Sequence, residues 1–93
     1  MKFEIRQTAR FKRQYRLAMR RGCRAEDFRR VIDVLASGGT LDERYHDHEL
    51  GGEYADVREC HIRPDWILMY MRDKGKLVLV LLKTGTHADL FGL

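Results

Sequence analysis

The sequence predicts a single small α+β domain over residues 1–93, with elements in the order β-α-α-β-β-β and a helical hairpin packed on a small, mainly antiparallel sheet. Three observations predict this fold class. Apolar residues recur at helical spacing in two stretches before residue 38, and strand-like runs follow after residue 53. The length is that of one compact domain with one modest core.

The N-terminal part predicts a short strand and two helices. The strand covers residues 3–5, and Thr8 is an N-cap residue for a helix that ends near Arg21, before Gly22. The apolar residues of this helix share one face: Phe11, Tyr15, Ala18 and Met19. A second helix is expected over residues 25–37, because Phe28, Val31, Ile32 and Leu35 recur at helical spacing before two glycines. The two helices therefore form a hairpin.

The rest of the chain predicts a long connection and three strands. Residues 38–52 are polar and bounded by glycine pairs, which is typical of a functional loop. Strands are expected over residues 54–62, 66–72 and 77–84, with a tight turn between the last two. Residues 77–82 are all apolar, which places this strand inside the sheet with helices on one side.

Composition and charge narrow the possible functions. Eighteen Lys and Arg residues against fourteen Asp and Glu give a net charge of +4, which favours contact with polyanions. Many of the cations lie in the first thirty residues: Arg6, Arg10, Arg13, Arg16, Arg20, Arg21, Arg24, Arg29 and Arg30. The sequence has neither a membrane-spanning run nor a signal peptide, so we expect a cytoplasmic protein that does not bind membranes. Cys23 and Cys60 lack zinc or disulfide spacing and predict two reduced thiols.

Histidines at strand ends and in the long connection are the candidate catalytic groups. His48, His61 and His87 stand where a rigid scaffold presents reactive side chains, and two imidazoles can supply a base and an acid. Asp65 could orient an imidazole or accept a proton itself. Two aromatic residues offer surfaces for an unstacked base: Trp66 and Phe91. For each of these residues, core packing or a place on the surface is the competing interpretation.

Motifs for other chemistries are missing from the sequence. It contains no H-E-x-x-H, no G-x-S-x-G, no phosphate-binding loop and no dinucleotide fingerprint. We therefore predict no metal and no other cofactor. His46 and His48 together with His61 and His87 would still offer several imidazoles to an ion, so a metal-assisted nuclease is one alternative.

Three ordered segments carry a resemblance to a known family. They are Asp47-His48-Glu49-Leu50-x-Gly52, then Arg58-Glu59-Cys60-His61-Ile62-Arg63-Pro64-Asp65-Trp66-Ile67-Leu68-x-Tyr70, and then Thr84-Gly85-Thr86-His87-Ala88-Asp89-Leu90-Phe91. In this order and spacing they resemble the YafQ-type toxins of the RelE/ParE superfamily. The resemblance is dense over residues 45–92, whereas the N-terminal strand and hairpin agree in layout more than in residues.

The resemblance implies a RelE-like fold and the toxin of a type II toxin–antitoxin pair, which cleaves mRNA on the ribosome without a metal. The implied partners are a cognate antitoxin protein, mRNA and the ribosome with its rRNA. The implied active-site positions are all present: His48, His61, Asp65, Trp66, His87 and Phe91. The ParE-like branch of the superfamily is associated with inhibition of DNA gyrase, so a non-nucleolytic inhibitor is the other alternative.

RNA cleavage agrees with this set of residues. The 2′-hydroxyl of RNA can attack its own adjacent phosphate once a base removes its proton and an acid protonates the departing 5′-oxygen. We expect His87 to be the general acid, with the base and its orientation supplied by His48, His61 and Asp65. Three nearby cations are candidates to bind the developing negative charge: Arg58, Arg63 and Lys83, of which Arg63 is the first choice. Surface salt bridges are their competing interpretation.

Overall fold

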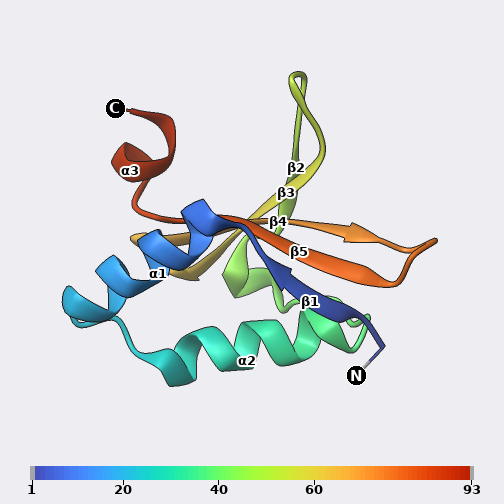
Figure 1. Cartoon of the computed structure of the whole chain (residues 1–93), viewed down its shortest axis with the longest axis horizontal. Coiled ribbons are helices and arrows are strands. Elements are labelled where there is room, and N and C mark those ends of the chain that lie inside the picture. Colours follow the sequence, from blue (N-terminus) through green and yellow to red (C-terminus); the bar gives the residue numbers. More distant parts are fainter. Residues whose placement is uncertain (1, 93) are drawn as a thin grey trace.

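The computed structural model describes residues 2–92, which form one mixed sheet with helices on both faces (Figure 1). The elements in chain order are β1 (Glu4–Gln7), α1 (Ala9–Arg20), α2 (Ala25–Ala36), the short 3₁₀ helix η1 (Glu43–Tyr45), β2 (His48–Gly51), β3 (Tyr54–Arg63), β4 (Trp66–Asp73), β5 (Val78–Gly85) and α3 (His87–Phe91). In the view of Figure 1, α2 lies below the sheet and α3 above it.

The five strands lie in the order β1-β5-β4-β3-β2. β1 runs parallel to β5, and every other neighbouring pair is antiparallel. The predicted α+β class with a mainly antiparallel sheet is therefore confirmed. The apolar run of residues 77–82 belongs largely to β5, which lies between β1 and β4, so its predicted place inside the sheet is also correct.

The predicted order β-α-α-β-β-β is incomplete, because it misses three elements. Residues 38–52 are not one loop, since they contain η1 and the edge strand β2, which pairs only with β3. An edge strand carries polar residues readily, so β2 gives no alternating apolar pattern in the sequence. α3 follows β5 and has five residues, too few to show helical periodicity.

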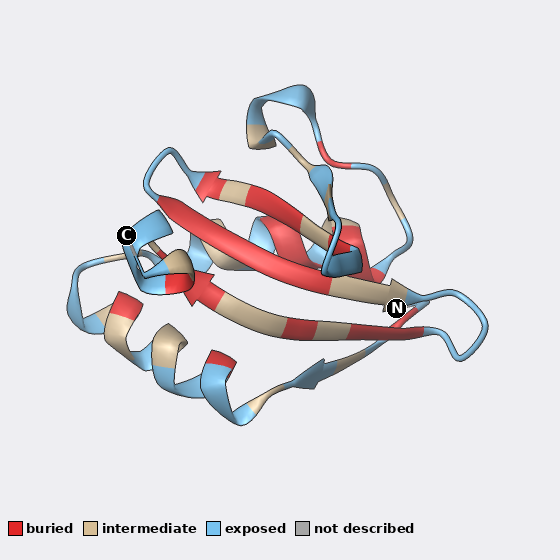
Figure 2. Cartoon of the chain, turned by 90° about the horizontal axis from the view of Figure 1, so that it is seen from above, coloured by how far each residue is buried: buried red, intermediate tan, exposed pale blue. Residues whose placement is uncertain are grey.

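α1 and α2 form where the sequence predicts them. The hydroxyl oxygen of Thr8 accepts a hydrogen bond from the amide of Phe11 (2.9 Å) and so caps α1. α2 carries Glu26 and Asp27 in its first turn, where negative charge complements the helix dipole. Figure 2 shows the buried residues concentrated along the inner strands. No helix within residues 2–92 combines the length and the apolar character that a membrane crossing requires.

Each face of the sheet has its own apolar cluster. The larger cluster joins the sheet to α1 and α2 and includes Phe11, Val31, Leu35, Cys60, Leu68, Tyr70, Leu79 and Leu81. The smaller cluster lies beneath α3 and consists of Val57, Ile67, Met69 and Leu90. Successive residues of a strand point to opposite faces. Because Val57 faces α3 and Cys60 faces the other helices, β3 presents Glu59 and His61 on the α3 face.

Candidate active site

Three imidazoles from separate elements meet around one carboxylate. His48 begins β2, His61 lies in β3, and His87 is the first residue of α3. Their Nε2 atoms lie 3.8, 3.6 and 3.7 Å, respectively, from Oε1 of Glu59. The structure thus brings together the three histidines that the sequence singles out, although they span forty positions of the chain.

The pairing of the strands produces this convergence. His48 lies opposite Glu59 in the β2–β3 ladder, so both side chains point to the same face. His61 follows two positions later on that face, in the same cross-strand row as Gly85 of β5. Only one residue separates Gly85 from His87. The end of β5 therefore delivers the third imidazole to the face that already carries the other two.

Glu59 is the buried centre of the cluster. It is only 4% exposed, and its carboxylate makes no hydrogen bond to any group within residues 2–92. A buried carboxylate is costly unless a charge or a hydrogen bond compensates it, so Glu59 depends on protonated imidazoles for its ion pairs. One ligand atom each from Glu59, His61 and His87 lies within 4.8 Å of the other two, and these three residues could also hold a metal ion.

Backbone carbonyls set the tautomers of two histidines. Nδ1 of His48 lies 2.7 Å from the carbonyl oxygen of His46, and Nδ1 of His61 lies 3.3 Å from that of Pro64. A carbonyl oxygen only accepts, so Nδ1 carries the proton in both rings. In the neutral form of each ring the lone pair is therefore on Nε2, which is the atom that faces Glu59. Both rings are oriented to accept a proton at this point.

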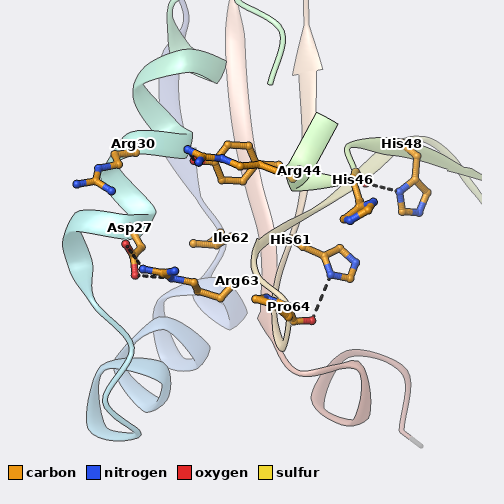
Figure 3. A pocket seen from close by; sticks show the side chains of 10 residues that line it. Asp27, Arg30, Arg44, His46, His48, His61, Ile62, Arg63 and Pro64 are labelled. Carbon is orange, nitrogen blue, oxygen red and sulfur yellow. Dashed lines mark hydrogen bonds and ion pairs between the residues drawn. The ribbon is translucent and has the colours of Figure 1, made fainter. Parts of the chain in front are cut away.

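A row of rings crosses the site from η1 to α3. Ring centroids are 5.7 Å apart for His46 and His61, 5.6 Å for His61 and His87, and 5.9 Å for His87 and Phe91. A cavity of about 720 Å³ opens at the His46 end, and Arg44 is among its lining residues (Figure 3). The site therefore has a cavity at one end and an aromatic ring at the other.

A hydrogen-bonded network fixes the segment that carries His46 and His48. The carboxylate of Asp47, between them, accepts hydrogen bonds from the hydroxyl of Tyr70 (2.6 Å) and from Arg58 (3.3 and 3.2 Å). Burial, followed by the adjacent Asp47 carboxylate, raises the pKa of Tyr70 above its usual value, so the phenol remains a donor. These hydrogen bonds of Asp47 thus fix the backbone that carries His46 and His48.

Comparison with known proteins identifies the family of this chain. The family model described as "Bacterial toxin of type II toxin-antitoxin system, YafQ" matches residues 3–92. The chain belongs to this family. It is 33% identical to the mRNA interferase toxin YafQ of Escherichia coli K12 over 96% of each chain. The predicted family is thereby confirmed.

Solved structures of bacterial toxins share the fold of this chain. The DinJ–YafQ complex of E. coli contains a chain with a TM-score of 0.88 and 31% identity, and the alignment covers 97% of the present chain and 99% of that one. A metal-bound toxin from Helicobacter pylori gives a TM-score of 0.90 with 31% identity over 96% and 99% of the two chains. The RelE-like architecture implied by the sequence therefore holds over nearly the whole length.

Two of the positions implied for YafQ toxins lie apart from the histidines. Asp65 lines a separate hollow of about 300 Å³ with Arg21 and Cys23, and no hydrogen bond or ion pair within residues 2–92 joins it to an imidazole. Trp66 is 2% exposed, and its Nε1 donates to Oγ1 of Thr84 (2.8 Å). Trp66 therefore offers no free face to a base and supports the site from within the core.

The three predicted cations differ in their partners. Arg58 is bound to Asp47, and Arg63 makes a bidentate pair with Asp27 of α2 (2.9 and 3.0 Å). This contact, chiefly through its hydrogen bonds, holds the pKa of Asp27 below its usual value. Lys83 has no ion-pair partner within residues 2–92, and the β3-β4-β5 ladder places it on the face that carries Glu59. Of the three predicted cations, Lys83 is thus the one that remains available to bind a phosphate.

Sequence reasoning missed Glu59. In the sequence it stands between Arg58 and Cys60, where it has the appearance of a solvent-facing residue of an ordinary strand. A signal was nonetheless present, because an acidic residue two positions before His61 must share its face of the strand. Its burial could not be foreseen, since that burial depends on β2 and α3, and the sequence pattern revealed neither of these elements.

Proposed function

We propose that this chain is an mRNA interferase, the endoribonuclease toxin of a type II toxin–antitoxin pair, which acts in the cytoplasm on ribosome-bound mRNA. One observation carries the proposal: three imidazoles and the Glu59 carboxylate converge on one open face beside a cavity. The E. coli relative that carries the name mRNA interferase toxin supports the same activity, because it matches 96% of both chains.

RNA carries the nucleophile for its own cleavage. The 2′-hydroxyl loses a proton to a base, its oxygen attacks the adjacent phosphorus, the bond to the 5′-oxygen breaks, and that oxygen takes a proton from an acid. The products are a 2′,3′-cyclic phosphate and a 5′-hydroxyl. This reaction needs neither a nucleophile from the protein nor a metal.

We assign the general acid to protonated His87 and the base to neutral His48 or His61. The Nε2 lone pairs of the two base candidates face the cluster, as proton transfer requires. Glu59 takes the orienting role that the sequence suggested for Asp65, because its carboxylate contacts all three Nε2 atoms. Two further residues complete the site: Lys83 as a cation on the same face of the sheet and Phe91 as the surface for a base.

A cognate antitoxin is the proposed protein partner. A similar YafQ was crystallised as a complex with DinJ, a toxin–antitoxin pair. The apolar faces of α1 and α2 are already used in the core, whereas α1 exposes five cations that form no ion pair within residues 2–92: Arg10, Lys12, Arg13, Arg16 and Arg20. This outer face suits an anionic partner, which can be an acidic antitoxin segment or rRNA.

A metal-assisted nuclease is the second candidate, and the geometry of Glu59, His61 and His87 favours it. The two mechanisms differ in their response to a chelator. We expect cleavage of ribosome-bound mRNA by the purified toxin to continue at its full rate in the presence of a chelator selective for transition metals, which leaves the Mg²⁺ of the ribosome in place. Loss of cleavage that returns on addition of one divalent metal would instead support the second candidate.

The 5′ ends of cellular transcripts, mapped after brief expression of the toxin, test the proposed function directly. We expect breaks at a fixed position within codons, with a 2′,3′-cyclic phosphate or its 3′-phosphate product upstream. A ParE-like inhibitor would arrest growth without such breaks, and its effect would survive alanine substitution of His48, His61 and His87. Growth arrest with intact transcripts would therefore overturn the proposal.

Gly85 should be required for the placement of α3. A Cβ at this position would lie 2.7 Å from Oδ2 of Asp89, the carboxylate that accepts a hydrogen bond from the amide of Thr86 in the capping box of α3. That amide, followed by Arg21, holds the pKa of Asp89 below its usual value. Gly85→Ala must displace Asp89 and with it His87, so we expect cleavage to be slower by about 10-fold or more.

Gly75→Ala provides the matched control for Gly85→Ala. Gly75 lies in the β4–β5 turn, and the nearest contact of an added Cβ is an ordinary 3.4 Å to a side chain of that turn. Single-turnover rates on ribosome-bound mRNA should therefore fall for Gly85→Ala and stay unchanged for Gly75→Ala. Equal rates for the two variants would show that the position of α3 is not set by Gly85.

A further inference from the structure

The cavity beside the histidines is much larger than the cleavage reaction requires. Its volume of about 720 Å³ falls in the range of roughly 300–1,000 Å³ that is usual for pockets that bind small organic molecules. Figure 3 shows Asp27 and Arg30 of α2 on one side of it, and His46 and His61 on the other. The reaction uses only the rim at His48 and His61, so the rest of the cavity is free for another part of the substrate.

Three guanidinium groups line the cavity, and only one of them has no carboxylate partner within residues 2–92. Arg63 is neutralised by Asp27, and Arg30 pairs with a glutamate of its own helix (2.8 Å). The guanidinium carbon of Arg44 lies 4.9 Å from the ring centroid of Tyr45, whose hydroxyl accepts a hydrogen bond from it (2.9 Å). Arg44 and Tyr45 thus form a flat, cationic surface that no acid occupies.

The segment that carries this surface is held at both ends. The carboxylate of Asp42 caps η1 by accepting a hydrogen bond from the amide of Arg44 (3.0 Å). His46, at the other end, has a φ of +50°, a left-handed backbone conformation that residues other than glycine rarely adopt. Asp47 then anchors the chain to Tyr70. Backbone strain that the fold maintains in this way concentrates at binding and catalytic sites.

We propose that this cavity binds one nucleotide of single-stranded RNA, next to the cleaved phosphate, with its base against Arg44 and Tyr45. Guanidinium planes and aromatic rings are the surfaces on which proteins stack unpaired RNA bases. The row of rings runs from His46 at the cavity to Phe91 at α3. Phe91 therefore holds the nucleotide on the opposite side of the cut. This subsite rests on the proposed ribonuclease function and adds base selection to it.

Substrates with one abasic nucleotide test this assignment. Single-turnover cleavage is measured on ribosome-bound mRNA that lacks the base immediately 5′ or immediately 3′ of the cut, at several toxin concentrations. Arg44→Ala is compared with Arg44→Lys, which keeps the charge but not the plane, and with Arg29→Ala, which removes an exposed arginine of α2 outside the cavity. Thermal unfolding of each variant confirms that it is folded.

On the intact substrate, Arg44→Ala is expected to raise the toxin concentration for half-maximal cleavage by roughly 5- to 100-fold, the range for loss of one base stack. Arg44→Lys should give an intermediate value, and Arg29→Ala should leave it unchanged. Removal of the base on the Arg44 side of the cut should impair the unmodified toxin but not Arg44→Ala. A further variant, Phe91→Ala, tests the other side. Removal of the base on that side should impair the unmodified toxin and have no further effect on Phe91→Ala. The subsite is overturned if Arg44→Ala matches Arg29→Ala, or if Arg44 and Phe91 respond to the same base. Failure of the unmodified toxin to cut any substrate would overturn the ribonuclease function itself.

Discussion

Replacement of His87 by alanine is expected to slow single-turnover cleavage of ribosome-bound mRNA by roughly 100-fold or more. The imidazole is exposed at the start of α3, with Nε2 3.7 Å from the Glu59 carboxylate, so it can carry a proton to the departing 5′-oxygen. Alanine is a good helix former, and the imidazole that it replaces is exposed and not part of the core, so the fold should be unaffected. A loss of rate without a loss of thermal stability would thus report the chemistry.

A modified substrate separates the loss of an acid from other defects in His87→Ala. When sulfur replaces the bridging 5′-oxygen, the leaving thiolate is far less basic than an alkoxide and departs without a proton. The variant should cleave this substrate nearly as fast as the unmodified toxin does. Near-normal cleavage of the ordinary substrate would reject the acid role, and failure of sulfur to restore the rate would point to a positioning defect.

Glu59→Gln is expected to lower the cleavage rate by roughly 10- to 100-fold while it stabilises the protein. Glutamine keeps the volume of the side chain but removes the charge that the three Nε2 atoms surround. The buried carboxylate has no hydrogen bond within residues 2–92 to compensate its charge, so a neutral side chain of the same size costs less to bury. Removal of the charge should raise stability by about 1 kcal/mol, or roughly 4–8 °C in melting temperature.

The opposite signs of the two effects make the Glu59 prediction specific. Glu53→Gln is the matched control, because this glutamate is exposed at the turn between β2 and β3 and should change neither quantity. A variant that is both fully active and no more stable would remove Glu59 from the mechanism.

Local signals in the sequence were sufficient for α1, α2 and the inner strands. Thr8 and Gly22 bracket α1 because a hydroxyl cap and a glycine stop act within one helical turn. The apolar run of β5 likewise reflects burial on both faces. β2 and α3 escaped prediction because one is a polar edge strand and the other has a single turn. In hindsight, the pair Thr86 and Asp89 was a legible capping signal for α3.

The convergence of the candidate residues could be anticipated where their place follows from strand ends, and could not be where their partners depend on packing. His48, His61 and His87 end up together because ladder register and a short turn bring them there. Charged partners across the fold cannot be read from local sequence, so neither the burial of Glu59 nor the pairing of Arg63 with α2 could be foreseen. Such contacts are set by tertiary structure alone.

The proposed acid stands on a short C-terminal helix. His48 and His61 belong to strands of a five-stranded sheet, whereas His87 lies on a five-residue helix that is held by its cap, by the burial of Leu90 and by the ion pair of Arg21 with Asp89 (2.7 Å). Detachment of so small an element costs far less than global unfolding. Displacement of α3 would therefore inactivate the enzyme while the rest of the domain stays folded. A partner that displaces this one turn would inhibit cleavage, and its release would restore activity on the timescale of a segmental motion.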